Sequence, residues 1–375
     1  MAQPPQKRAR LSTTAGEDAD SDRTDNENES DEDEADFPEV YRLPGGLKPD
    51  VRLLVFNREY HVHSVILKLH SNYFRKFLDS PDKSSEPASV NFQYEYVTVV
   101  DGDGIWALEP ANKVKDPVFT PERLQLLENR GISISLERFN FENLISAMYN
   151  RPYELNSSWD VIDLTCIADF CCALPIVSAT LSGQLVESDF IIGPVNEEHI
   201  SGDSVSLIFA ARKLRHKRLF HECLIHIVSQ FSKIESKVRD GLDDLQKDKE
   251  IYALVLKHYM QLCKKIMKAE YEQIRFMQTT QHKWKPSPAA QQVMSPKPET
   301  NAAYYREIQK QLRAEENKHG ECAKSFKLAV DDLLENQLWL GISGIEPGCG
   351  AYKRRFLSCD AEHIEYPWDE DEVDW

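Results

Sequence analysis

The sequence lacks several features that would assign a chain to a special class. Its eight cysteines form no CxxC pair, and it has neither a signal peptide nor the run of about 20 apolar residues that a membrane-spanning helix needs. We therefore expect a soluble protein with free thiols, a reducing compartment and no membrane contact. Fifteen glycines and nineteen prolines are too few for a collagen-like or low-complexity chain.

Net charge is also missing outside the two ends of the chain. Residues 17–39 hold thirteen acidic residues against the single base Arg23, and residues 369–375 hold five acidic residues and no base. These two segments account for the whole formal net charge of −17, so the rest of the chain is neutral. Because a general nucleic-acid binder needs a basic face, we expect no direct contact with nucleic acid.

The chain is long enough for two or three domains, with 375 residues of which 41% are hydrophobic. Residues 1–36 carry almost no apolar side chains, and we expect them to be disordered. Within them, Lys7, Arg8 and Arg10 form a basic cluster that nuclear import receptors can read, although such clusters also occur by chance. The cluster favours the nucleus slightly over the cytoplasm.

Alternating apolar residues predict a small sheet near the start of the folded region. Residues 51–55 and 59–63 are expected to form a hairpin, and residues 92–100 a third strand. Between them, Ser64 is predicted to cap one helix and Ser71 a second. A second hairpin and a short helix at 122–129 are expected to follow.

The rest of the sequence shows mainly helical periodicity. Three helices are expected between residues 139 and 185, and an amphipathic stretch over residues 204–231. Residues 241–282 and 302–338 predict two long helices, separated by a proline-rich linker at 283–300 that no helix crosses. Such a helix pair either offers a groove to a partner helix or, more commonly, packs on itself.

This order of hairpin, helix pair, strand and three helices resembles a BTB/POZ domain. The resemblance is carried by residues 49–78, in which Asp50 opens the first strand, His63 ends the second, and Ser71 and Phe74 start the following helix. It implies an α+β fold in which a short sheet with a helical cluster precedes an all-α C-terminal region with two long helices.

The expected domain organisation has five parts. They are a disordered tail at 1–45 that is first basic and then acidic, a BTB/POZ domain at 46–190 with an inserted loop near 80–130, a helical region at 191–282, the linker at 283–300, and a long helix with an acidic tail at 301–375. In addition, residues 207–231 and 367–375 resemble a group of fungal BTB-domain proteins.

The resemblance implies that Asp50 and His63 have a structural role, because these two positions support each other by hydrogen bonding in the family. Deleting one partner of such a buried polar pair costs about 1–3 kcal/mol. The competing interpretation is a catalytic His–Asp pair with Ser64 as the nucleophile, but helix capping explains Ser64 more simply. Prolines and glycines within residues 37–48 exclude the swapped N-terminal helix of many family dimers, which leaves a homodimer open.

No motif for a cofactor, a metal or an enzyme emerges from the remaining polar residues. His61 and His63 share one strand face but lack the further ligands that a metal site needs. His216, His221 and His226 follow one another at intervals of five, so they fan around a helix and are predicted to lie at its surface or boundary.

Two further patterns concern the adjacent cysteines and a basic cluster. Of Cys171 and Cys172, one is expected to lie in the core and the other at its boundary. The cluster at residues 212–218 contacts either an acidic partner or the chain's own acidic tail, or it is a solvated helix face, which we favour.

The resemblance implies a protein-interaction module and no enzyme, with other proteins as partners. One function typical of the family is a substrate adaptor for a cullin-type ubiquitin ligase, and the partner contact is then expected at Leu136, Phe139 and Phe141. The alternative is a nuclear regulatory scaffold that associates with another BTB protein, or with its own copy, without a ubiquitin ligase.

Overall fold

The structure is a computed structural model that describes residues 38–80, 89–101, 104–187, 200–231, 239–281, 283–314, 320–338, 348, 352–359 and 364–372. Residues 38–375 belong to one compact unit. The basic cluster Lys7, Arg8 and Arg10 and most of the acidic N-terminal segment lie outside the described residues.

The sheet has five strands in the order β1-β3-β2-β4-β5 and contains both parallel and antiparallel neighbours. Its strands are β1 (Glu39–Val40), β2 (Val51–Val55), β3 (Arg58–Val62), β4 (Tyr94–Val100) and β5 (Trp106–Pro110). β2 and β3 form the predicted hairpin across Phe56 and Asn57, both at positive φ, and β2 pairs parallel with β4. β4 and β5 form the second hairpin, so the strands expected from alternation are confirmed.

The ordered chain begins earlier than expected. β1 pairs parallel with β3, and Tyr41 directly after it is buried. The hydroxyl group of Tyr41 lies 3.1 Å from Ser146 Oγ, and the Arg151 guanidinium lies 4.6 Å from the centre of its ring. The expectation of a disordered tail up to residue 45 is therefore wrong for residues 38–45, because an added strand and a buried aromatic ring hold them.

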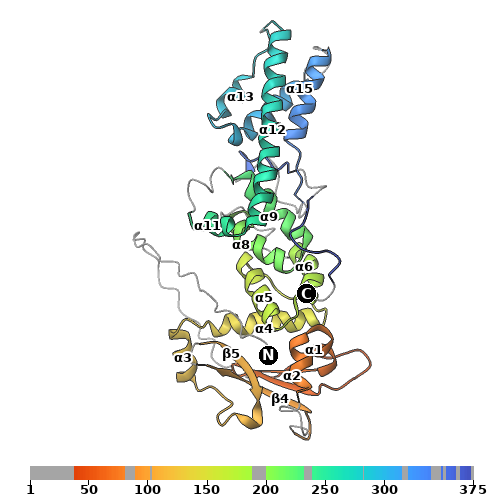
Figure 1. The fold of residues 1–375 in the computed structure, drawn as a ribbon, viewed down its shortest axis with the longest axis vertical. Helices are drawn as coiled ribbons and strands as arrows, with labels where there is room; N and C mark the ends of the chain where they lie inside the picture. The colour runs from red at the N-terminus through yellow and green to blue at the C-terminus, as the bar shows by residue number, and fades with distance from the viewer. Residues whose placement is uncertain are drawn as a thin grey trace, which may run out of the picture. The chain divides into compact units, whose positions relative to one another are not determined.

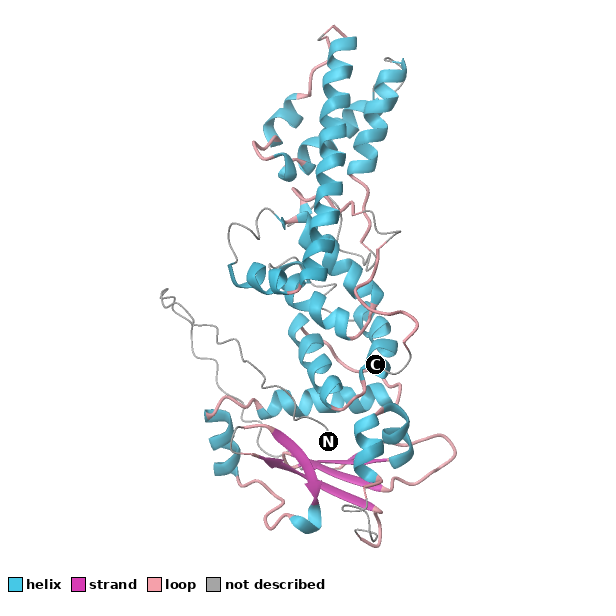
Figure 2. Ribbon diagram, viewed as in Figure 1, coloured by secondary structure: helices cyan, strands magenta, loops and turns pink. Residues whose placement is uncertain are grey.

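Six helices surround or follow the sheet in the first half of the chain. They are α1 (Ser64–His70), α2 (Asn72–Leu78), α3 (Pro121–Asn129), α4 (Ile134–Met148), α5 (Ser158–Phe170) and α6 (Leu174–Glu187), with a short 3-10 turn η1 (Ala111–Lys113). Figures 1 and 2 show α4 lying across the sheet. There Phe141 packs against Tyr60 and Trp106, with ring centres 5.5 and 6.0 Å apart.

The C-terminal region is helical, but its predicted long helices are broken. The described elements are α8 (Ile200–Lys213), α9 (Lys217–Ser229), α11 (Arg239–Lys247), α12 (Lys249–Thr279), α13 (Pro288–Val293), η2 (Pro298–Thr300), α14 (Ala302–Ala314) and α15 (Gly320–Leu333). The single helix expected over 241–282 stops at Asp248, whose carboxylate accepts a hydrogen bond from the N–H of Ile251 (3.1 Å) and so starts α12 as a new helix. The helix expected over 302–338 is divided into α14 and α15.

The proline-rich segment is not a bare linker. Pro288 occupies the first turn of α13, where the missing N–H has no helical partner to lose. Ser287 caps this helix through the N–H of Ala290, and both Ala290 and Trp284 are buried, the latter against Phe276 and Phe326. The segment at 283–300 therefore packs into the C-terminal core, which contradicts the expectation of an open linker. None of the helices in the described part of the chain is long and apolar enough to cross a membrane.

Candidate protein-interaction surface

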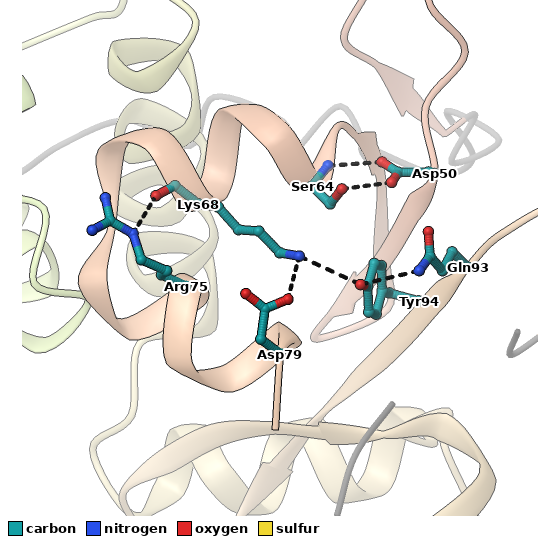
Figure 3. A network of polar contacts seen from close by, with 7 residues as sticks. All are labelled: Asp50, Ser64, Lys68, Arg75, Asp79, Gln93 and Tyr94. Atoms are coloured by element: carbon teal, nitrogen blue, oxygen red, sulfur yellow. Dashed lines mark hydrogen bonds and ion pairs between the residues drawn. The ribbon is translucent and has the colours of Figure 1, made fainter. Parts of the chain in front are cut away.

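Asp50 stands where three strands and a helix meet. Its carboxylate accepts hydrogen bonds from the backbone N–H of Ser64 (2.7 Å) and from the Ser64 hydroxyl (2.6 Å), as Figure 3 shows. Its own backbone N–H donates to Val62, and its carbonyl oxygen accepts from Gln93 and Tyr94. Asp50 therefore fixes the start of α1 to the ends of β2, β3 and β4.

This arrangement corrects the predicted cap of α1. Ser64 is the first residue of the helix, His63 is at the N-cap position, and His63 makes no side-chain capping bond. The cap is supplied from outside the helix by Asp50, 14 residues earlier. A Ser64 cap would accept from a backbone N–H two or three residues later, whereas the folded hairpin brings the charged Asp50 acceptor to the N–H of Ser64 itself.

His63 is buried and uses both of its ring nitrogens. Nε2 lies 2.9 Å from the carbonyl oxygen of Leu47, which can only accept, so this nitrogen carries the proton. In the neutral ring, Nδ1 then accepts from the hydroxyl of Tyr149 (2.8 Å), which itself accepts from the backbone N–H of His63 (2.7 Å). Burial raises the pKa of Tyr149, so its hydroxyl remains a donor.

The expected hydrogen bond between His63 and Asp50 is absent from the bonds of these described residues, because each binds a different partner. The two residues are linked through Ser64, whose backbone follows His63 and whose polar groups bind Asp50. A catalytic His–Asp pair needs the carboxylate to orient the ring and a free ring nitrogen to take a proton. The hydrogen bonds of His63 and Asp50 meet neither condition.

Ser71 caps α2 as its spacing predicts. Its hydroxyl oxygen accepts from the N–H of Phe74 (3.0 Å) and donates to the carbonyl oxygen of Cys171 at the end of α5 (2.5 Å). Phe74 is fully buried. Cys171 is buried, as predicted for one member of this pair, but Cys172 is exposed and does not lie at the boundary of the core.

A second polar group connects α1 to the end of α2 and to β4. Lys68 Nζ lies 2.5 Å from Asp79 Oδ1 and 3.5 Å from the hydroxyl of Tyr94, which also receives the Gln93 amide (Figure 3). The Arg75 guanidinium donates to the carbonyl oxygen of Lys68 (3.1 Å). These contacts hold the helix pair against the sheet from its solvent side.

The three residues of the expected partner contact divide between surface and core. Leu136 in the first turn of α4 is 37% exposed, and Phe139 is half-buried. Phe141 is 1% exposed because it fills the space between α4 and the sheet. Its place in the predicted contact is therefore wrong, since a folded chain does not present this ring to a partner.

α1 presents an apolar face that sequence analysis missed. Val65 and Leu69 are 54% and 64% exposed, and their spacing of four residues puts them on one side of the helix. The pattern of α1 alone suggested an inward apolar face, which Leu67 provides. The sequence of α1 did contain a signal for this outer face, because the helix has more apolar residues than its one inward face can hold.

The basic cluster at residues 212–218 contacts acidic residues of the same chain. It forms the turn between α8 and α9, where Arg212 pairs with Asp248 and Glu250, and Lys213 lies 2.5 Å from Asp169. Arg215 pairs with Glu372 and donates to the carbonyl oxygen of Asp369, and Lys217 lies 2.6 Å from Glu370. Of the three interpretations, contact with the chain's own acidic tail is the one that the structure shows, and the favoured one, a solvated helix face, is wrong for these residues.

Aromatic packing holds the same C-terminal segment. The ring of Trp368 meets Phe220 on α9 edge to face at 5.1 Å and stacks on Tyr366 at 4.7 Å. The Arg212 guanidinium donates to the carbonyl oxygen of Pro367 (3.2 Å). We call residues 366–372 the docked tail, because apolar and charged contacts both fix it to α8 and α9.

The three regularly spaced histidines are buried, which contradicts their predicted place at the surface or boundary of the helix. His216, His221 and His226 are each at most 5% exposed, because α9 is covered on nearly every side. His216 caps α9: its Nδ1 accepts from the N–H of Leu219 (3.1 Å), and its Nε2 lies 2.9 Å from Ser182 Oγ. Their five-residue spacing could not predict this burial, because neighbouring helices cover α9.

The surroundings of His216 and His221 disfavour their protonated forms. Burial, assisted by the Arg218 charge, lowers the pKa of His216 to about 4. Burial also lowers the pKa of His221 to about 4, although the nearby Glu222 acts in the opposite direction. Within the described part of the chain, no group of three or more His, Cys, Asp or Glu side chains could hold a metal ion.

Comparison with known proteins bears on the region of Asp50 and His63. No curated protein and no solved structure matches the chain. The likeness of residues 207–231 and 367–375 to fungal BTB proteins stays a prediction. The family model that does match is that of the BTB/POZ domain, over residues 43–101, which run from the segment before β2 to the end of β4. The chain thus carries a BTB/POZ domain, with a small mixed sheet, in a structure that is otherwise mostly helical.

Proposed function

We propose that the chain is a protein–protein interaction adaptor that presents substrates to a cullin-type ubiquitin ligase. The observation that carries the adaptor function is the BTB/POZ match at residues 43–101, because such domains are in general interaction modules rather than enzymes. The geometry at Asp50 and His63 is in keeping with this, since their polar atoms bind backbone and side-chain groups of the domain itself.

The proposed cullin contact is the exposed start of α4. The indole N–H of Trp106 donates to Glu137 (2.9 Å), and Arg138 donates to the carbonyl oxygen of Phe56, so both polar residues of this turn hold α4 on the sheet. Leu136, directly before these two anchored residues in the sequence, is 37% exposed. An apolar side chain on a rigid, anchored helix is a suitable centre for a protein contact because little order is lost on binding.

Retention of a purified cullin scaffold on the immobilised full-length chain tests this proposal. We expect the wild-type chain to retain the cullin and Leu136→Asp to lose it, because a buried unpaired carboxylate opposes docking. The matched control is Met294→Asp, which changes an exposed apolar residue in the C-terminal region. Equal retention by Leu136→Asp, or none by the wild type, contradicts the cullin part of the proposal.

The second candidate is a nuclear regulatory scaffold that associates with another BTB protein or with a second copy. The exposed pair Val65 and Leu69 on α1 favours it, because two adjacent apolar side chains on a polar surface suit an interface. Sedimentation of the wild-type chain against Leu69→Glu tests the association. Imaging of a chain with Lys7, Arg8 and Arg10 changed to Ala tests the nuclear part, which fails if nuclear accumulation persists.

A further inference from the structure

Helix α12 carries large apolar side chains on two opposite faces. One face is buried in the C-terminal core and includes Leu262, Ile266 and Phe276. Figure 1 shows α15 running beside α12, and Lys265 of α12 lies 2.9 Å from Asp332 of α15. The opposite face carries four exposed residues, which we call the methionine stripe: Met260, Met267, Tyr271 and Ile274.

The methionine stripe is continuous along the helix. Its members follow at intervals of seven, four and three residues, so at about 100° per residue they fall within an arc of about 60°. Over these four residues the stripe is about 21 Å long. Each member is between 57% and 67% exposed. Burial of one apolar face is enough to hold a helix such as α12 in the fold. Packing among the described residues therefore does not explain the stripe.

A row of basic residues runs along one edge of the stripe. We call this row the basic edge: Lys257, Lys264, Lys268 and Arg275. All four lie on one side of the stripe, within about 90° of its centre. The other edge, at Tyr259, Cys263 and Glu270, has no base. Acids of this chain already lie near three of its members: Lys257 Nζ is 3.7 Å from Glu365, Lys268 Nζ is 4.0 Å from Asp332, and Arg275 is 3.6 Å from Glu272. These contacts are long and the basic side chains are about half exposed, so they are weak and leave the bases accessible to a partner's carboxylates.

The acidic segments of the chain itself do not fit the stripe. Residues 17–36 offer twelve acidic residues, but Ala19 and Ala35 are their only apolar side chains. They match the basic edge and leave the stripe uncovered. The docked tail places its aromatic residues against Phe220 on α9, so they are engaged elsewhere.

A second copy of the chain is also a poor match in charge. When two identical helices pair antiparallel, each edge faces its own copy, so the two basic edges would lie against each other. A parallel pair would set the basic edge against the opposite edge, whose one acidic residue is Glu270. Neither pairing sets a row of acidic residues opposite the basic edge.

We propose that α12 binds an amphipathic helix of another protein, one with an apolar face and a row of Asp or Glu along one edge. The apolar face covers the methionine stripe, and the acidic row pairs with the basic edge. Methionine suits such a surface because its flexible thioether adapts to differently shaped partners. The proposal extends the adaptor function proposed above by naming the chemistry of a further partner.

Selection from a peptide library on the immobilised full-length chain tests this proposal. The library holds helical peptides of about 21 residues, with Leu at positions a and d of each heptad and with Glu, Lys or Gln at random at e and g. We expect enrichment of peptides that carry Glu along one edge. Selected peptides should bind Met267→Glu and Lys264→Glu at least about tenfold more weakly than the wild type, since each change removes one component of recognition.

Two controls separate the stripe from general stickiness and from the cullin contact. Leu328→Glu, at an exposed apolar position of α15, and Leu136→Asp should both bind the selected peptides like the wild type. A peptide with Lys in place of Glu should recover binding to the double variant Lys264→Glu/Lys268→Glu. Three outcomes would overturn the proposal, whatever the cullin experiment gives. They are enrichment of peptides without a charge preference, peptide binding that Met267→Glu leaves unchanged, and a wild-type dimer that Met267→Glu dissociates.

Discussion

The carboxylate of Asp50 receives both the backbone N–H and the hydroxyl group of Ser64, at 2.7 and 2.6 Å. One side chain at the start of β2 thereby caps α1 and aligns the helix pair with the sheet. Asp50 and Ser64 both lie within the BTB/POZ match at residues 43–101. Their contact explains these polar residues by the conformation that they stabilise.

Replacing Asp50 by Ala should lower the free energy of unfolding by about 1–3 kcal/mol, because two donors of Ser64 lose their acceptor. Chemical denaturation followed by circular dichroism measures the change. Asp79→Ala is the matched control: Asp79 pairs with Lys68 at the surface, and such exposed pairs contribute about 0–1 kcal/mol. A loss for Asp50→Ala no larger than that for Asp79→Ala would show that the cap has no structural weight.

Phe141 and Leu136 should respond oppositely in stability and in binding. Phe141→Ala removes a buried ring and should cost about 3–5 kcal/mol of stability. Leu136→Asp, at the exposed position, should change stability by less than about 1 kcal/mol while it abolishes cullin retention. Thermal unfolding of both variants checks the division between core and surface. If Leu136→Asp unfolds the domain, the residue belongs to the core and the proposed contact has to move.

Acid should destabilise the protein between pH 6.5 and pH 4 through His216 and His221. The pKa of each is lowered to about 4 in the folded chain, so the unfolded chain takes up protons first as the pH falls. Above the unfolded-state pKa of about 6.5, the two histidines do not lower the free energy of unfolding. The loss of stability is complete below the folded-state pKa of about 4. The penalty is at most about 3 kcal/mol for each histidine, given 1.36 kcal/mol per pKa unit.

Denaturation midpoints recorded across this pH window measure the effect. His221→Phe should flatten the slope, since one of the two titrating groups is gone. An unchanged slope in this variant would mean that other groups cause the acid sensitivity.

The docked tail should detach when its aromatic anchor is removed. Trp368→Ala deletes the ring that contacts Phe220 and Tyr366. The remaining ion pairs of Arg215 and Lys217 are weak alone because their partners Glu372 and Glu370 are about half exposed to solvent and salt. Limited proteolysis should then cut the C-terminal segment faster than in the wild type. Asp371→Ala, which lies in the same segment without such contacts among the described residues, should be cut at the wild-type rate.

The sheet and the first helices could be predicted because their signals are local. Alternation marks β2 and β3, and the spacing of Ser71 to Phe74 marks a capped helix. Local sequence patterns give the wrong prediction where a residue distant in the sequence determines the structure. Asp50 replaces Ser64 as the cap of α1 because the hairpin brings it there, and His216 and its neighbours are buried by helices that their own periodicity cannot reveal.

Two errors in the C-terminal region had a readable signal. Asp248 stands three residues before Ile251, which is the spacing of an N-cap, but continuous apolar periodicity hid the break. Pro288 follows Ser287, which is the pattern of a helix start as well as of a linker. Contact with the acidic tail was one of three alternatives that charge left open and was not the favoured one, because the aromatic contact with Phe220 that holds the tail depends on the tertiary fold.

The most direct test of the adaptor account is a binding titration of the purified full-length chain with a purified cullin scaffold by calorimetry. The account predicts saturable binding with a dissociation constant of about 1 μM or tighter, and at least about tenfold weaker binding for Leu136→Asp in a chain that unfolds like the wild type. Absence of heat at concentrations of about 50 μM would contradict it, because an affinity weaker than that does not support a stable assembly.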